Sequence, residues 1–323
     1  METSAEKVFR IAIAPFQHLL DDPTITEINV NGDGPDDVWV SGMGGRRQID
    51  IVVNKGFVRA AINALATHTK RDANSNSEDA FISQKFGNLR VTGILSPISY
   101  KGDALAIRKH TVSVITLDDM VSGGGIDESA KEMMIHIVES GANFLVAGGT
   151  DAGKTTVLNA MLAHVPPRER VITIEDGVEL NIVAKNNLRL LENKSSNVTV
   201  EKLLHGVLRT SPDRAICGEI RKKEEAVNFL DVMNSGHEGC CSTIHANSCQ
   251  RALLRLERLL LQSGEPSQES ARIGIASLIE YIIHFKKDKA DSRRYLTGII
   301  NIKDYTKGDY VLETIHNGTW KGK

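Results

Sequence analysis

Two things are missing from this chain of 323 residues: a long apolar run and a strong net charge. No uninterrupted apolar segment approaches the roughly 20 residues that a membrane-spanning helix needs. The formal net charge is −2, so no basic field favours wrapping of nucleic acid, and we expect no sequence-specific nucleic-acid binding. The first six residues lack the basic and apolar regions of a signal peptide. These absences predict a cytoplasmic protein that reaches a membrane only through partners.

Cysteine is also scarce, and its placement excludes a metal centre of the usual spacing. The four cysteines lie in the second half of the chain, at Cys217, Cys240, Cys241 and Cys249. We expect reduced thiols there rather than a disulfide framework. Charged residues at 25% and hydrophobic residues at 41% are ordinary for a globular protein, and the length suggests two domains.

A glycine-rich loop is the strongest local signal in the sequence. It fits the pattern G-x-x-x-x-G-K-[ST] and comprises Gly148, Gly149, Thr150, Asp151, Ala152, Gly153, Lys154, Thr155 and Thr156. The loop follows the apolar run 143–147 and precedes a helix-like stretch at 157–163, which is the context that the motif requires. A glycine-rich turn that binds nothing is the alternative, and the agreement of motif and context disfavours it.

The chemistry of this loop suits a nucleoside triphosphate. Glycines let backbone N–H groups turn inward around a phosphate, and the N-terminus of the following helix adds positive potential. Lys154 supplies a mobile charge for the outer phosphates, and Thr155 offers a hydroxyl to Mg²⁺. We therefore expect ATP and Mg²⁺ as the ligands of this loop.

The first part of the chain, residues 1–118, reads as a small α+β domain. A strand at 25–30 is followed by a turn and a second strand at 38–40, which is typical of a hairpin. A helical pattern covers 57–67, and strand-like runs cover 89–95 and 104–107. The glycines near position 124 predict a linker over 119–130, because consecutive glycines are entropically costly in ordered structure.

The second part, residues 131–323, alternates strands with helices. Apolar runs at 143–147, 170–175, 214–219 and 241–245 are separated by helical patterns. This rhythm predicts an α/β domain with a largely parallel sheet.

Three polar clusters follow apolar runs of this second part. Glu175 ends one strand, Glu219 ends another, and the segment from His237 to His245 surrounds a third. In open α/β sheets the ligand lies beyond the carboxyl ends of the strands, where carboxylates can hold Mg²⁺ through water or orient a water molecule. Each cluster alone could be a helix cap or a satisfied polar group. Their order behind a phosphate loop predicts one shared site.

With this phosphate loop and these polar clusters, the chain resembles the secretion ATPase superfamily that drives type II and type IV secretion and type IV pili. The resemblance is strongest to the hexameric ATPases of conjugative type IV secretion. Four family boxes occur in family order: the phosphate loop, an aspartate box at 174–176, a Walker B region ending at Glu219, and a histidine box at 236–247. The stretches 20–32 and 107–109 are also similar, so the resemblance covers nearly the whole chain.

Two positions depart from the family pattern. Asp151-Ala152 stands where a Gly-Ser pair is common, and Cys240-Cys241 replaces a serine and an apolar residue. Neither change removes a phosphate-binding glycine or the lysine. Asp151 adds negative charge near the phosphates and is therefore a candidate brake on turnover.

The resemblance implies a role for each matched residue. Lys154 would engage the β- and γ-phosphates, Thr155 the metal, and Glu219 the hydrolytic water or, through water, Mg²⁺. Glu175 would be a second acidic residue at the γ-phosphate and His245 a sensor of that phosphate. His237, which we place among the nucleotide-binding residues, would lie near a subunit or domain contact.

Two arginines of the first domain complete the implied set. Arg90 and Arg108 match arginines that reach the nucleotide when the two domains close in relatives, where a charged fork stabilises the leaving phosphate. An ion pair on the face of a strand is the alternative reading of both.

The resemblance further implies a RecA-like ATPase domain behind the smaller N-terminal domain, assembled as a homohexamer. Such a ring would hydrolyse ATP to power substrate translocation or pilus biogenesis. It would sit at the cytoplasmic face of the inner membrane, with inner-membrane secretion components and a coupling ATPase as partners. A pilus assembly ATPase of the tight-adherence or type IV kind remains open. So do a nucleic-acid motor, which the charge disfavours, and a nucleotide-dependent switch that does not hydrolyse.

Overall fold

The computed structural model describes residues 4–32, 37–42, 45–51, 55–69, 80–86, 89–109, 115–193, 196–264, 267–288 and 291–318. The chain divides into two compact units, residues 1–113 and 114–323. Each unit has its own sheet and its own apolar core.

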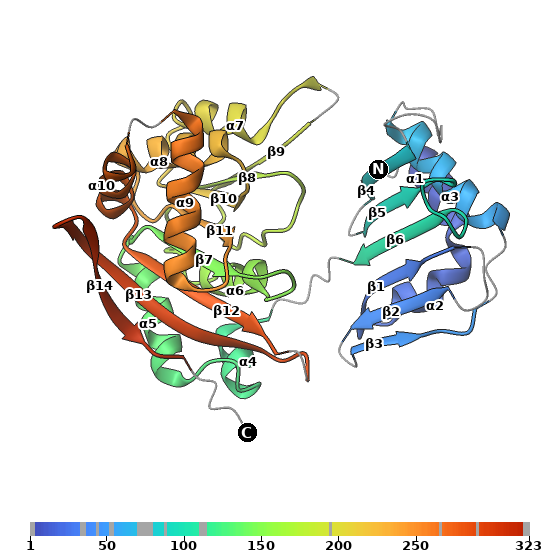
Figure 1. The fold of residues 1–323 in the computed structure, drawn as a ribbon, viewed down its shortest axis with the longest axis horizontal. Helices are drawn as coiled ribbons and strands as arrows, with labels where there is room; N and C mark the ends of the chain where they lie inside the picture. Colours follow the sequence, from blue (N-terminus) through green and yellow to red (C-terminus); the bar gives the residue numbers. More distant parts are fainter. Residues whose placement is uncertain are drawn as a thin grey trace. The chain divides into compact units, whose positions relative to one another are not determined.

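The first unit is built on a six-stranded antiparallel sheet with the order β3-β2-β1-β6-β5-β4 (Figure 1). Its strands are β1 (Ile25–Val30), β2 (Val38–Gly42), β3 (Gly45–Gln48), β4 (Phe81–Phe86), β5 (Leu89–Ile94) and β6 (Ala104–Lys109). Its helices are α1 (Ser4–Ala12), η1 (Ala14–Phe16), α2 (Gln17–Asp21) and α3 (Lys55–Thr69). Alternate residues of β5 and β6 are buried in a core shared with α1 and α3, as a sheet with one covered face requires.

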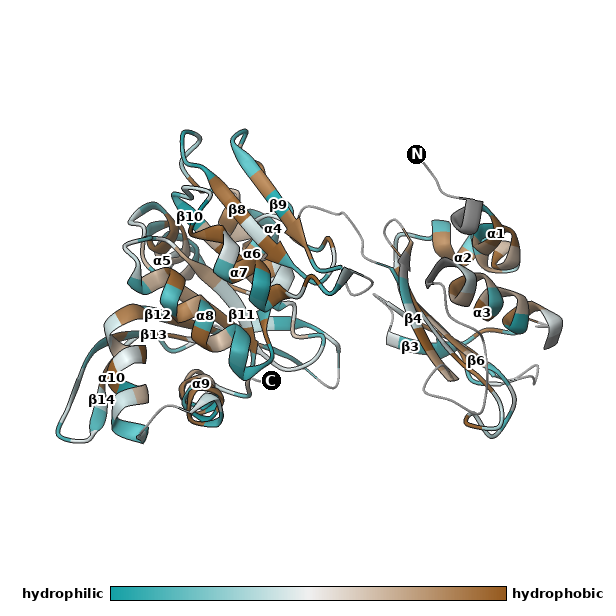
Figure 2. Ribbon diagram, turned by 90° about the horizontal axis from the view of Figure 1, so that it is seen from above, coloured by the Kyte–Doolittle hydropathy of each residue, from teal (hydrophilic) through white to brown (hydrophobic). Residues whose placement is uncertain are grey.

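The second unit contains an eight-stranded sheet with the order β14-β13-β12-β7-β11-β10-β8-β9. Its strands are β7 (Phe144–Gly148), β8 (Val171–Glu175), β9 (Asn187–Leu191), β10 (Arg214–Ile220), β11 (Cys241–His245), β12 (Tyr281–Lys287), β13 (Arg294–Thr306) and β14 (Asp309–His316). Neighbours from β12 to β9 pair in parallel, whereas β13 and β14 form an antiparallel extension. All five residues of β8, which lies beside the edge strand β9, are buried, and Figure 2 draws this strand largely in hydrophobic colours, as expected for parallel strands covered on both faces.

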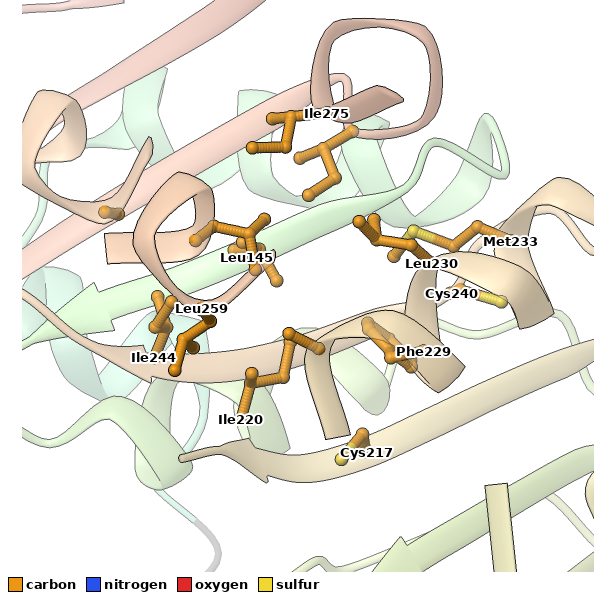
Figure 3. Packing of buried hydrophobic residues seen from close by; sticks show 14 of the residues in the cluster. Leu145, Cys217, Ile220, Phe229, Leu230, Met233, Cys240, Ile244, Leu259 and Ile275 are labelled. Carbon is orange, nitrogen blue, oxygen red and sulfur yellow. The ribbon is translucent and has the colours of Figure 1, made fainter. Parts of the chain in front are cut away.

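Helices cover both faces of this sheet, so the unit has three layers. The helices are α4 (Leu117–Ser122), α5 (Glu128–Glu139), α6 (Lys154–Leu162), α7 (Val200–Val207), α8 (Lys223–Asn234), α9 (Cys249–Ser263) and α10 (Gln268–Leu278). One core lies under α7 to α10 and the other under α4 to α6. Figure 3 shows part of the first core, where Leu145 of β7 and Ile220 of β10 lie among side chains of α8 and α9 such as Phe229 and Leu259. The predicted α/β fold with a largely parallel sheet is confirmed.

The glycine-rich segment near position 124 differs from a linker in the structure. Residues 119–130 hold the end of α4, a turn and the start of α5, all within the second unit. Gly124 has φ +69° and closes α4: its N–H donates to Val121 O, and the N–H of Gly125 donates to Met120 O. This is the Schellman arrangement, in which glycine supplies the left-handed residue that ends a helix. The glycines are therefore required by a helix terminus.

The helices and the cysteines of the structure bear on two expectations from the sequence. Across the parts of the chain that the structure describes, no helix is both long and apolar enough to cross a membrane. All four cysteines are buried free thiols. Burial raises the pKa of the Cys240 thiol to about 11, which keeps it protonated and unreactive near neutral pH.

Candidate nucleotide-binding site

The glycine-rich loop leaves the carboxyl end of β7 and enters α6, which begins at Lys154. The nine residues of the motif lie in this turn and in the first turn of α6. Gly153, with φ +85°, is the N-cap residue of α6, and neither a side-chain cap nor an acidic residue occupies that helix end. The first N–H groups of a helix have no partner within the helix itself. An anion such as phosphate would satisfy them here.

Lys154 is the cation at the centre of this loop, and it is only 8% exposed. Its Nζ atom lies 3.2 Å from Gly149 O and 3.2 Å from Nε2 of His245. It also lies 3.8 Å from Oε1 of Glu219. Three of the predicted residues, from three different strand ends, therefore converge at one point.

Glu219 reaches this point because β10 contains a bulge. Cys217 pairs with Ser242 and Glu219 with Thr243, so Gly218 is the extra residue in the ladder with β11. The Thr243 hydroxyl donates to Gly218 O at 2.8 Å and fixes the bulge. Bulges commonly re-aim a side chain beside a functional site, and here the Oε1 atom of Glu219 lies 3.0 Å from Nε2 of His245.

Arg221 connects Glu219 to the aspartate that follows β8. Its Nε donates to Oε2 of Glu219 at 2.7 Å, and its Nη1 donates to the carboxylate of Asp176. Burial lowers the pKa of Arg221, but the hydrogen bond and charge of Asp176 and the charge of Glu219 outweigh it, so the net shift is upward. The guanidinium is therefore a permanent charge that holds the Glu219 carboxylate in place.

His245 ends β11 and is neutral under ordinary conditions. Burial lowers the pKa of His245, the ammonium of Lys154 lowers it further, and the Glu219 carboxylate opposes both. A neutral imidazole can use its Nε2 either to accept a hydrogen bond from Lys154 or to donate one to Glu219, but not both. Its choice depends on whether Lys154 is engaged elsewhere, for instance by a phosphate.

The donor set also fits a hard divalent cation. Thr155 follows Lys154 in the first turn of α6, and no hydrogen bond of its side chain occurs within the described part of the chain. A hydroxyl and a carboxylate beside a triphosphate are the oxygen ligands that Mg²⁺ prefers. Thr155 could hold the metal directly and Glu219 through a water molecule.

Glu175 is held by donors from its own surroundings, and its role at the γ-phosphate stays a prediction. Its side chain is 1% exposed, and its Oε2 accepts the N–H groups of Glu179 and Leu180 at 2.7 and 2.8 Å. Its Oε1 accepts from Thr173 Oγ1 at 3.1 Å and from Arg189 Nη2 at 3.0 Å. The chain folds back after β8, so these donors converge on the carboxylate. Glu175 holds this turn together, and Asp176 is the acidic residue that reaches the cluster, through Arg221.

His237 also lies away from the phosphate loop within the second unit. It precedes β11, whereas His245 ends it, and the five residues of β11 separate their two edges of the sheet by roughly 15 Å. His237 Nδ1 lies 2.9 Å from Ser235 Oγ, beside a surface pocket of about 300 Å³ that Arg214 and Glu238 also line. Its position is at the other edge of the sheet from Lys154, and its role toward a nucleotide or at a subunit contact stays a prediction.

The two arginines of the first unit are brought together. Arg90 of β5 and Arg108 of β6 are directly opposite each other on the exposed side of the sheet. Arg108 Nε lies 3.9 Å from Oε1 of Glu27, which is a weak surface ion pair. Their role toward a nucleotide stays a prediction.

Sequence reasoning missed residues at two places near the loop. Arg221 lies two positions after Glu219, and alternate residues of a strand share a side, so the spacing carried a usable signal. Arg294 and Lys287 contact Asp151 from β13 and β12. No local pattern could have placed them there, because they are far from the loop in the chain.

Comparison with known proteins agrees with this architecture. The family model described as "Type II/IV secretion system protein" matches residues 12–286. The conjugal transfer protein TrbB of Rhizobium radiobacter is 30% identical over 297 residues, covering 91% of this chain and 88% of its own. The structure of the ATPase DotB of Yersinia pseudotuberculosis aligns with a TM-score of 0.66 at 16% identity, covering 95% of this chain and 81% of that one.

A second solved structure has the same fold: the pilus retraction motor PilT with bound ADP. It aligns with a TM-score of 0.63 at 18% identity, covering 94% of this chain and 81% of that one. The family match spans most of both compact units. The resemblance seen in the sequence is confirmed: this chain belongs to the type II/IV secretion system protein family.

Proposed function

We propose that this protein is an ATP hydrolase that uses Mg²⁺ and works as a homohexamer in type IV secretion or conjugative transfer. The observation that carries the proposal is the convergence of Lys154, Glu219 and His245 beside the uncapped start of α6. A buried ammonium, a set of open N–H groups and a carboxylate are the groups that phosphoryl transfer to water requires.

Each group has a distinct task in hydrolysis. Lys154 and the first N–H groups of α6 bind the phosphates and offset the charge that builds up on them. Glu219 orients the attacking water and draws on its proton, because its carboxylate is held by Arg221 and lies beside Lys154. Mg²⁺, when held by Thr155 and through water by Glu219, would neutralise phosphate charge.

Arg90 and Arg108 belong to this proposal as the source of further positive charge on the leaving phosphate. Arginine suits the task because its guanidinium is permanently charged and offers a fork of donors. Loss of the terminal phosphate would then destabilise the conformation that these contacts favour. The difference between the affinities for ATP and ADP could in this way drive a conformational change.

The choice of secretion over a pilus rests on the relatives. TrbB, named as a conjugal transfer protein, is 30% identical over nearly the whole chain, whereas the pilus motor PilT is 18% identical. We accordingly propose inner-membrane secretion components and a coupling ATPase as partners, at the cytoplasmic face of the inner membrane. A pilus assembly ATPase is the second candidate, since the same fold serves the retraction motor.

The test is phosphate release by the purified full chain with Mg²⁺ and ATP, over a range of protein concentrations. Lys154→Ala should abolish turnover and leave the circular dichroism spectrum and the assembly unchanged. Lys303→Ala, on the exposed part of β13, is the control and should behave as wild type. Light scattering should give six subunits at the concentrations where turnover is highest. Undiminished phosphate release by Lys154→Ala refutes the assignment.

A further inference from the structure

The phosphate loop contains an aspartate whose backbone is in an unfavourable conformation. Asp151 has φ +59°, in the left-handed region that favours glycine. Its carboxylate also stands in a loop shaped to hold anions. Both features oppose phosphate binding unless other groups compensate for them.

Two cations from the β12–β13 hairpin make contact with this one residue. Arg294 Nε donates a hydrogen bond to Asp151 O at 2.8 Å, and Lys287 Nζ lies 3.7 Å from Asp151 Oδ2. Lys287 and Arg294 are paired in register at the end of the two strands. The hairpin therefore holds the carbonyl of Asp151 and offsets its negative charge.

The same hairpin also packs against the glycines of the loop. A Cβ atom on Gly153 would lie 2.9 Å from Cδ of Arg294, and one on Gly148 would lie 2.7 Å from Phe285 O. At Gly148 the obstacle is a backbone atom that cannot move aside, whereas at Gly153 a side chain would displace Arg294 and would be strained by the φ of +85°. The first and last glycines of the motif are thus needed for contact with the hairpin as well as for access of a phosphate.

The position of Arg294 is itself fixed from the other side. Leu296 N donates to Gly125 O at 2.8 Å, and a Cβ on Gly125 would lie 2.8 Å from Arg294 O. The turn after α4 therefore sets the start of β13, and β13 sets the guanidinium on the phosphate loop. Contacts within the second unit make a continuous support for the loop.

We infer that Arg294 is a positioning residue for nucleotide binding, which holds Asp151 and with it the phosphate loop in the conformation that accepts phosphates. This inference rests on the proposed nucleotide-binding function. We call this contact between Arg294 and Asp151 the brace. A loop with glycine at position 151 would depend on it less, because glycine adopts the left-handed conformation without cost.

The brace has a thermodynamic signature that differs from a direct phosphate contact. If the loop leaves its competent conformation, the apparent Kd rises by the reciprocal of the competent fraction, whatever the ligand. Loss of Arg294 should therefore weaken ATP and ADP by the same factor. A residue that touched the terminal phosphate would weaken ATP alone.

The experiment measures the Kd of Mg-ATP and Mg-ADP by calorimetry on the full chain. Arg294→Ala should raise both values by about 3- to 10-fold, the equivalent of one hydrogen bond. Arg294→Lys, which keeps the charge but loses the Nε donor, should give Kd values close to those of Arg294→Ala. Arg293→Ala is the matched control, since the neighbouring Arg293 pairs with Asp291. Its Kd values should equal those of wild type.

A double-mutant cycle with Asp151→Gly decides between the brace and a general loss of fold. In the glycine background, Arg294→Ala should change either Kd by less than in wild type, because glycine keeps the carbonyl that accepts the bond but adopts the left-handed conformation without the cost that the Asp151 side chain adds. Equal effects of Arg294→Ala in both backgrounds, or a loss confined to ATP, would overturn the brace. Failure of wild type to bind either nucleotide would instead refute the proposed function, so the two failures are distinguishable.

Discussion

The Oε1 atom of Glu219 lies 3.0 Å from Nε2 of His245, at the ends of the adjacent parallel strands β10 and β11. The bulge at Gly218 makes this contact possible, because it shifts the register just before Glu219. Lys154 approaches the same two atoms from α6. Binding of a phosphate by Lys154 would therefore change the hydrogen bond available to His245 and, through it, the setting of Glu219.

The first prediction concerns Glu219 itself. Glu219→Gln keeps the size of the side chain but removes the carboxylate that draws on the proton of the water, so phosphate release should fall by roughly 100-fold or more. Binding of Mg-ATP should change by only a few fold, because Lys154 and the start of α6 remain. Rapid-quench measurement of the hydrolysis step, together with calorimetry, separates the two quantities. A variant that keeps most of its turnover would remove Glu219 from the proposed chemistry.

The second prediction separates a structural from a catalytic role for Glu175. Glu175→Gln leaves Arg189 without its charged partner and weakens two bonds from backbone N–H groups, so the free energy of unfolding should fall by about 1–3 kcal/mol. Denaturant titration measures it. Glu132→Gln, on the exposed side of α5, is the control and should lie within about 0.5 kcal/mol of wild type. Loss of turnover with unchanged stability would restore Glu175 to the terminal phosphate.

Much of the site could be predicted because strand order and motif order carry the same information. Apolar runs identified the strands that end at or just before Glu219, His245 and the phosphate loop of Lys154, and the carboxyl ends of parallel strands meet at one edge. The same rule places His237 at the other edge of the sheet, because a residue that precedes a strand lies opposite a residue that ends it. The direction of a strand is visible in the sequence, so the separation of His237 from Lys154 could also have been predicted.

The remaining differences depend on tertiary contacts that no local pattern encodes. Glu175 is tied to the turn after β8 because the chain folds back and presents two N–H groups to it. Arg294 reaches the phosphate loop only because β12 pairs with β7 and β13 pairs with β12. The glycines near position 124 suggested a linker, but the structure uses them to end α4 and to admit β13.

The third prediction tests the charge of Lys287. Lys287→Ala removes a cation that lies beside the Asp151 carboxylate, so Mg-ATP should bind several fold more weakly at low salt. The repulsion between solvent-accessible charges is screened over about 10 Å at 0.1 M salt, so the deficit should shrink as salt is added. Titrations at several ionic strengths measure it.

A second substitution, Asp151→Asn, removes the charge that Lys287 faces and so distinguishes this local effect from a general loss of positive potential. Lys287→Ala combined with Asp151→Asn should bind Mg-ATP as tightly as Asp151→Asn alone. The comparison is the factor by which Lys287→Ala raises the Kd of Mg-ATP in the Asp151→Asn background and in wild type. If the two factors are equal, Lys287 acts on the nucleotide and not through Asp151.

The last prediction concerns stability in mild acid and His284, which supports the segment after His245. Its Nε2 lies 3.2 Å from Ala246 O, and the side chain is buried. Burial lowers the pKa of His284, and the charge of Lys286 lowers it further, against the effect of the Ala246 carbonyl. The folded protein therefore binds fewer protons at this position than the unfolded chain, whose histidine has a pKa of about 6.5.

The sign of the effect follows from proton linkage. Stability rises with pH wherever the unfolded state binds more protons, so the contribution of a neutral His284 is complete above about pH 6.5 and is lost as pH falls toward its lowered pKa. Denaturant titrations between pH 5 and 7, a range that includes the unfolded-state pKa of about 6.5, should show this slope in wild type. His284→Gln should be less stable at neutral pH but have a shallower slope. The slope of stability against pH in His284→Gln should stay above zero, because the pKa of His245 is also lowered. An unchanged slope in His284→Gln, with His136→Gln on the exposed side of α5 as the reference variant, would mean that His284 is not the group that titrates.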